Sequence, residues 1–69
     1  MTLTQNTVVA TPARYCKYFV TPAASTVEGS NDGTTWVTQT VSAQGEFETK
    51  AALIRLTSAG PALVRAVAA

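Results

Sequence analysis

The sequence predicts an all-β protein, a small antiparallel β-sandwich or partial jelly roll with an N-terminal arm. Three observations lead to this fold class. A turn sequence at 29–33 lies between two runs of strand-forming residues, two prolines bracket another such run, and a Gly-Pro turn separates two apolar segments near the C-terminus. At 69 residues the chain forms one domain at most, which we divide into an arm over 1–11 and a β domain over 12–69.

The N-terminal part is polar and then briefly β-branched at 7–9, before Pro12. It predicts an arm with one short strand, or alternatively a frayed terminus. The next segment, 14–20, is rich in aromatic and β-branched residues and lies between Pro12 and Pro22. Two prolines so close together disfavour a helix, so this segment predicts a strand.

The segment 29–33, Gly-Ser-Asn-Asp-Gly, is the strongest local signal in the chain. It predicts a hairpin turn between strands at 25–28 and 34–41, because Asn and Asp tolerate tight turns and Gly can adopt a positive φ. In the second strand, Val37 and Val41 are expected on one face and the tryptophan on the other. The predicted turn and core residues are Gly29, Asn31, Asp32, Gly33 and Trp36.

The remaining elements are shorter. Residues 42–45 resemble a turn, and 46–48, Glu-Phe-Glu, resembles an exposed edge strand. The apolar segments 51–57 and 62–69 predict a hairpin around Gly60-Pro61. A short C-terminal helix is the alternative, because Ala, Leu and Arg favour helices and Pro61 suits a first helical position.

The composition points to association with other chains. Apolar residues make up 46% of the chain and charged residues only 13%, against roughly a quarter in an average soluble domain. A domain this small usually needs disulfides, a metal or a partner subunit. A single cysteine, Cys16, permits no intrachain disulfide, and there is no histidine for a metal site. Association with further protein chains is the stabilising device that remains.

Conventional catalytic sites are not expected, so the chain is predicted not to be an enzyme and to need no cofactor. Histidine, the usual base for a nucleophile, is absent. Glu46 and Glu48 would share one face of a strand, which is typical of a solvated edge, and Cys16 is expected to pack as a small apolar residue. The glycines are not followed by the Lys-Ser/Thr of a phosphate-binding loop.

Charge and hydropathy argue against two classes of partner. The net charge is +1 without a basic cluster, which disfavours nucleic acid. No apolar run approaches the roughly 20 residues of a membrane-spanning helix, and the N-terminus lacks the features of a signal peptide.

The residues 27–36, Val-Glu-Gly-Ser-Asn-Asp-Gly-Thr-Thr-Trp, followed by Leu-Ile-Arg-Leu at 53–56, resemble the discoidin family, also called coagulation factor 5/8 type C. The resemblance covers the second half of the chain and implies a β-sandwich of jelly-roll type. It also implies that Trp36 is a core residue and that Arg55 belongs to the framework. Members of that family often bind carbohydrate or lipid head groups, but no binding residue of the family is matched here.

From these features we expect a structural subunit of a large symmetric assembly, a bacteriophage virion protein acting in capsid decoration or in the tail or neck. Its expected partners are copies of itself and a larger shell or tube protein, and its expected location is the virion, assembled in the host cytoplasm. The alternative is a minimal discoidin-like carbohydrate-binding module that holds a glycan with Tyr15, Tyr18 or Trp36. The candidate interface residues are Arg14, Tyr15, Tyr18, Arg55 and Arg65.

Overall fold

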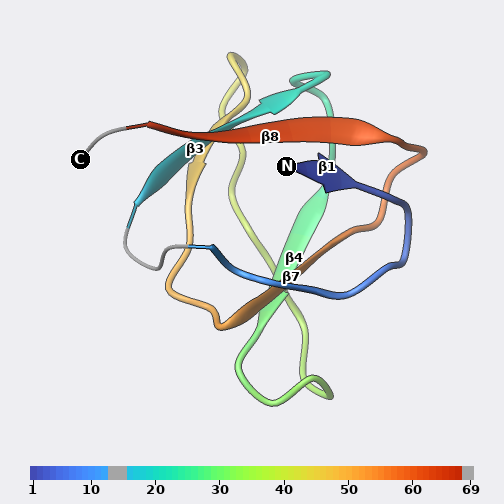
Figure 1. The fold of residues 1–69 in the computed structure, drawn as a ribbon. Coiled ribbons are helices and arrows are strands. Elements are labelled where there is room, and N and C mark those ends of the chain that lie inside the picture. The colour runs from blue at the N-terminus through green and yellow to red at the C-terminus, as the bar shows by residue number, and fades with distance from the viewer. Residues whose placement is uncertain (13–15, 68–69) are drawn as a thin grey trace.

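The computed structural model describes residues 1–12 and 16–67, and within them the protein is all-β. Eight strands form two four-stranded antiparallel sheets (Figure 1). The strands are β1 (Thr2–Leu3), β2 (Val9–Ala10), β3 (Lys17–Thr21), β4 (Val27–Ser30), β5 (Val37–Thr38), β6 (Glu46–Glu48), β7 (Leu53–Leu56) and β8 (Ala62–Val67). The predicted fold class is confirmed, and the alternative C-terminal helix is wrong, because 62–67 is strand β8.

The strand order is that of a complete jelly roll rather than a partial one. One sheet has the order β1-β8-β3-β6 and the other β2-β7-β4-β5. The chain crosses from sheet to sheet at each connection except that between β4 and β5, which are hydrogen-bonded neighbours. Eight strands distributed in this way over two sheets have jelly-roll connectivity. A chain of 69 residues achieves it because four of the strands are only two or three residues long.

The core lies between the two sheets and consists of alternate residues of the longer strands. In β3 the pattern of exposure is out-in-out-in-out, so that Tyr18 and Val20 point inward. Tyr18 stacks on Phe47 of β6 with ring centroids 5.5 Å apart. The buried core residues are Leu3, Tyr18, Val20, Val27, Phe47, Ile54, Leu56, Ala62 and Val64. Each sheet therefore covers the inner face of the other.

The predicted N-terminal arm over 1–11 is instead part of the sandwich. β1 pairs with β8, β2 pairs with β7, and Leu3 is fully buried. Between these strands the backbone N–H of Asn6 donates to the carbonyl of Leu56 at 2.7 Å. Because this segment supplies the outer strand of each sheet, it is an integral part of the β-sandwich.

The predicted hairpin between 51–57 and 62–69 is also wrong. Both segments form strands, but β7 lies in one sheet and β8 in the other (Figure 1). The physical reason is burial: Ile54 of β7 and Val64 of β8 face each other's sheet across the core, which a two-stranded hairpin within one sheet would not allow.

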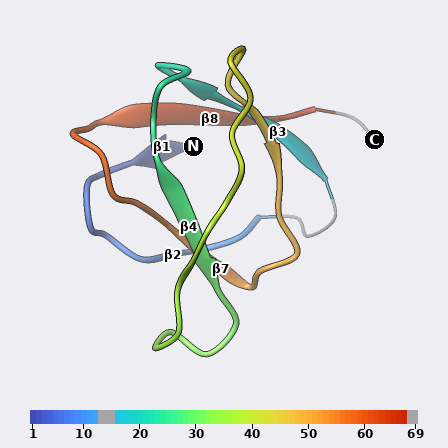
Figure 2. The ribbon, with the colours of Figure 1, turned by 180° about the vertical axis from the view of Figure 1, so that it is seen from behind.

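The predicted hairpin between β4 and β5 exists, although its second strand is much shorter than the predicted 34–41. Val37 pairs with Gly29 and Thr38 with Glu28. The backbone N–H groups of Thr34 and Thr35 donate to the Asp32 carboxylate instead of joining the ladder. The connecting loop projects away from the body of the sandwich (Figure 1 and Figure 2).

Candidate interaction surface

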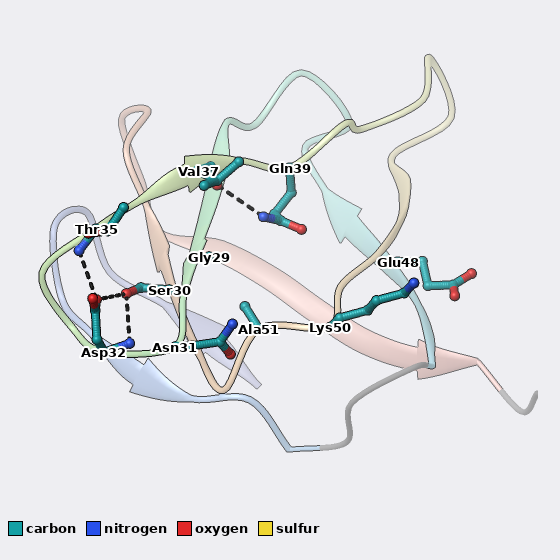
Figure 3. Close-up of a pocket in the computed structure, with 10 residues that line it drawn as sticks. All are labelled: Gly29, Ser30, Asn31, Asp32, Thr35, Val37, Gln39, Glu48, Lys50 and Ala51. Carbon is teal, nitrogen blue, oxygen red and sulfur yellow. Dashed lines mark hydrogen bonds between the residues drawn. The ribbon is translucent and has the colours of Figure 1, made fainter.

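One side of the sandwich is open to solvent at a cleft, which is lined by residues of edge strand β5 of one sheet and edge strand β6 of the other. A shallow cleft of about 630 Å³ occupies this side. It lies between the β4–β5 hairpin and the segment 48–51 (Figure 3). The lining residues are Gly29, Ser30, Asn31, Asp32, Thr35, Val37, Gln39, Glu48, Lys50 and Ala51.

The turn at one end of the cleft is held by two short side chains. The Asp32 Oδ1 atom accepts hydrogen bonds from the backbone N–H groups of Thr34 and Thr35, both at 2.8 Å, and from the Ser30 hydroxyl at 3.0 Å. The Ser30 hydroxyl in turn accepts from the N–H of Gly33 at 2.9 Å. Gly33 has a φ of 78°, the left-handed conformation that its residue type favours. The sequence-predicted roles of Asp32 and Gly33 in the turn are confirmed.

Two other predicted turn residues have different surroundings. Gly29 lies within β4, where a Cβ atom would come within 2.7 Å of the Ala51 Cβ and 2.8 Å of the Gln39 Nε2. It is required for close packing at the cleft floor and not for the turn. Asn31 does lie in the turn, and its Oδ1 accepts from the Ala52 N–H at 2.9 Å. Asn31 thereby ties the β4–β5 hairpin to the segment before β7.

The hydrogen bonds from Thr35, Thr34 and Ser30 lower the pKa of Asp32 from 3.8 to about 2. All of these donors favour the charged carboxylate, which explains the direction of the shift. A depressed pKa in the folded state means that the carboxylate stabilises the fold at pH values above its unfolded pKa. This contribution is lost as the pH falls through the folded pKa of about 2.

We therefore expect Asp32→Asn to be less stable than the wild type at neutral pH, with a difference that shrinks as the pH falls from about 4 to about 2. Asn retains an acceptor oxygen at this position but lacks the charge. Urea unfolding of both proteins at several pH values measures the difference. Glu48→Gln, at an exposed carboxylate that makes none of the turn hydrogen bonds, is the control. A difference that stays constant down to pH 2 contradicts this role for Asp32.

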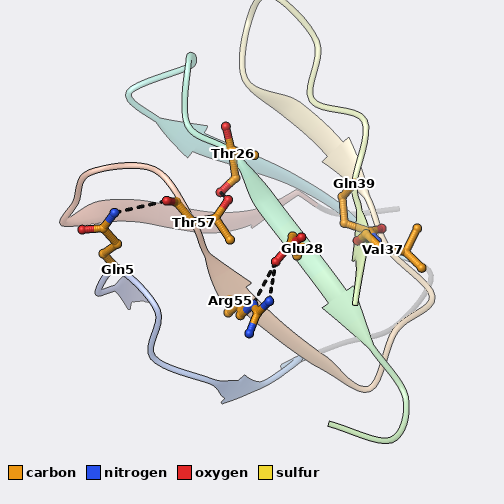
Figure 4. A network of polar contacts seen from close by, with 7 residues as sticks. All are labelled: Gln5, Thr26, Glu28, Val37, Gln39, Arg55 and Thr57. Atoms are coloured by element: carbon orange, nitrogen blue, oxygen red, sulfur yellow. Dashed lines mark hydrogen bonds and ion pairs between the residues drawn. The ribbon is translucent and has the colours of Figure 1, made fainter. Parts of the chain in front are cut away.

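Trp36 is not a core residue, contrary to the prediction. It is half-buried on the outer face of the β2-β7-β4-β5 sheet, where the Arg55 guanidinium lies 4.2 Å from the centre of its ring. Arg55 also donates through Nε to Glu28 Oε1 at 2.8 Å, in the register that places these two residues opposite each other (Figure 4). The neighbouring Val37 lies on the same face as buried Gly29, so the alternation of side chains directs Trp36 to the opposite, outer face.

The predicted interface residues differ in their exposure in the structure. Arg14 and Tyr15 lie outside the described residues. Tyr18 is 1% exposed and belongs to the core, so its predicted place in an interface is wrong. Arg55 is half-buried and paired with Glu28 inside the chain. Arg65 is exposed on β8, with its guanidinium 5.0 Å from the centre of the Phe19 ring, and remains available to a partner.

Sequence reasoning missed the two large apolar residues that the fold leaves most exposed. Val37 of β5 and Leu63 of β8 are each 61% exposed. Leu63 points outward from its sheet, whereas Val37 lies at the cleft, on the same face as buried Gly29. The alternation of the sequence correctly separates Val37 from Thr38. It carries no signal that this particular strand lies at an edge.

The sequence matches no protein-family model, and comparisons with curated proteins and with solved structures find no match either. Among the described residues, there is no helix of the length and apolar character needed to cross a membrane. Those residues also contain no group of three or more acidic, cysteine or histidine side chains placed to hold a metal ion.

Proposed function

We propose that this chain is a structural subunit of a large symmetric assembly, acting by packing against copies of itself and against a larger shell or tube protein. The observation that carries the proposal is the open side of the sandwich, where Val37 faces the cleft and is 61% exposed. The inward-facing apolar residues of two other edge strands, Leu3 of β1 and Phe47 of β6, are buried. A neighbouring subunit would provide the same cover for Val37.

A virus particle, and specifically a bacteriophage virion, is the assembly that we propose, with the chain in capsid decoration or in the tail or neck. The jelly-roll connectivity supports this by analogy, because viral capsid proteins are among the known users of this fold. Lectin domains also use it, so the analogy alone does not decide the function. The small size, the low charge and the exposed apolar residues favour the structural role.

The carbohydrate-binding alternative is weakened by the positions of its aromatic residues. Of the three proposed to stack on a sugar, Tyr18 is buried in the core and Trp36 has one face against Arg55. Tyr15 lies outside the described residues. The cleft has polar side chains such as Asn31 and Gln39, but its described lining contains no aromatic ring. The exposed side chains therefore fit contact with another protein better than they fit stacking on a sugar.

The proposal is tested on particles purified from cells that produce the chain. We expect quantitative mass spectrometry to find it there in a fixed ratio to the main shell or tube protein, and we expect glycan arrays to show no binding by the free protein. A chain that is found only outside particles, and that binds a glycan as a monomer, contradicts the proposal and favours the carbohydrate-binding alternative.

A further inference from the structure

Among the residues that the structure describes, no strand pairs with the outer edge of β5. On its inner side, Val37 pairs with Gly29 of β4, and the N–H of Gln39 donates to the carbonyl of Val27 at 2.8 Å. Alternate residues of an antiparallel strand direct their N–H and C=O groups to opposite sides. The backbone groups of Trp36 and Thr38 therefore point away from β4, toward the position that a further strand would take.

This edge lacks the features that discourage strand pairing at two other edges of the sandwich. β6, on the same open side, has glutamates at both of its ends, Glu46 and Glu48. β2 is followed closely by Pro12, which has no backbone N–H to donate. In contrast, residues 33–45 contain no charged side chain and no proline, and most residues of 34–41 are β-branched. Charges and prolines are the usual protection of a sheet edge, so β5 is unprotected.

The same segment is suited to pairing with an identical copy. In a two-fold antiparallel pair every residue meets a residue of its own segment, so like charges in the segment would repel one another. Because 33–45 is uncharged, no such repulsion arises at β5, whereas β6 would bring glutamates together. A pair centred on Val37 also places the two exposed valines opposite each other.

We infer that β5 pairs with β5 of a second copy of this chain, antiparallel and centred on Val37. Since the backbone groups of Val37 point toward β4, the two valines form a pair without hydrogen bonds, in which side chains approach most closely. The hydrogen bonds lie on either side, between Trp36 of one copy and Thr38 of the other. The β2-β7-β4-β5 sheets of the two copies then join into one continuous sheet. The two valines cover each other at the mouth of the cleft. This inference rests on the proposed function and identifies one contact of the assembly.

The test compares Val37→Lys with Leu63→Lys, two variants that add the same charge at residues of the same 61% exposure. Sedimentation equilibrium measures self-association of each purified protein. We expect the wild type and Leu63→Lys to dimerise, and Val37→Lys to raise the dissociation constant by at least about tenfold, because the pair would bring two lysines together. Circular dichroism checks that both variants fold.

Amide hydrogen exchange of the wild type gives a second measurement that needs no variant. We expect the N–H groups of Trp36 and Thr38 to become protected as the protein concentration rises, and the N–H of Val64, on β8 of the other sheet, to remain unchanged. The inference is overturned if the wild type is a monomer, if both lysine variants dimerise equally, or if Trp36 and Thr38 gain no protection. If the chain is still incorporated into particles in any of these cases, the proposed function stands and the subunits must contact each other through another surface.

Discussion

Leu3→Ala is expected to lower the free energy of unfolding by about 2–5 kcal/mol, the usual cost of truncating a fully buried leucine. Leu3 is in the core cluster although it lies only three residues from the N-terminus. A single hydrophobic core in a domain of this size rarely supplies more than about 3–5 kcal/mol. The variant should therefore be largely unfolded at room temperature. Urea unfolding followed by circular dichroism measures the loss.

The matched control is Leu63→Ala, the same change at a leucine that is 61% exposed in the structure. We expect it to cost less than about 0.5 kcal/mol, as is usual for surface positions. Removal of residues 1–11 should be more severe than Leu3→Ala, because it deletes β1 and β2 and leaves β8 and β7 without their outer neighbours. Equal effects of the two leucine variants, or a truncated protein that folds normally, contradict the place of this segment in the sandwich.

The features that sequence predicted correctly are those determined by neighbouring residues. The Asn-Asp-Gly turn folds as expected because Asp32 and Gly33 satisfy local hydrogen-bonding and backbone requirements. The strand between Pro12 and Pro22 and the edge strand Glu46–Glu48 were likewise readable from short patterns. The overall all-β class follows from these elements, since the type of each one is indicated by its own residues even though its pairing partners lie far along the chain.

The errors concern which strands become neighbours. The segment 1–11 is polar on average, and nothing in it indicates that Leu3 reaches the core through pairing with β8, some sixty residues along the chain. The adjacency of 51–57 and 62–69 suggested a hairpin, yet the jelly roll sends them to different sheets. Such pairings depend on how the two sheets pack against each other, and a short sequence pattern gives no information about that packing.

The candidate surface was predicted least well, for a related reason. Whether an apolar residue is buried depends on which distant parts of the chain come to lie over it. Leu3 and Phe47 are buried although β1 and β6 are edge strands, whereas Val37 on edge strand β5 is exposed at the cleft. Trp36 has the size of a core residue, but the alternation of side chains along the strand places it on the outer face of its sheet, against Arg55.

Gly45→Ala is the second substitution for which we expect a large loss of stability. Gly45 precedes β6 with a φ of 87°, and its N–H and C=O bond to the Ser42 carbonyl and the Val20 N–H, both at 2.9 Å. A Cβ atom there would collide with the backbone oxygen of Val20 and lie 3.2 Å from the Cα of Ala23. Backbone atoms cannot rotate away as a side chain can. Left-handed strain of about 1–2 kcal/mol and overpacking of about 1–3 kcal/mol add to roughly 2–5 kcal/mol.

Gly33→Ala separates these two contributions. Gly33 has a similar φ of 78°, but the nearest atom to an added Cβ is the Leu53 Cδ1 at 3.6 Å, an ordinary contact. This variant should lose only the stability that corresponds to left-handed strain, about 1–2 kcal/mol. The difference between the two alanine variants, measured by urea unfolding, then reports the steric conflict with Val20 alone. Equal losses would mean that the turn before β6 moves away from β3 at little cost, so that the close approach of the two segments is not needed for the fold.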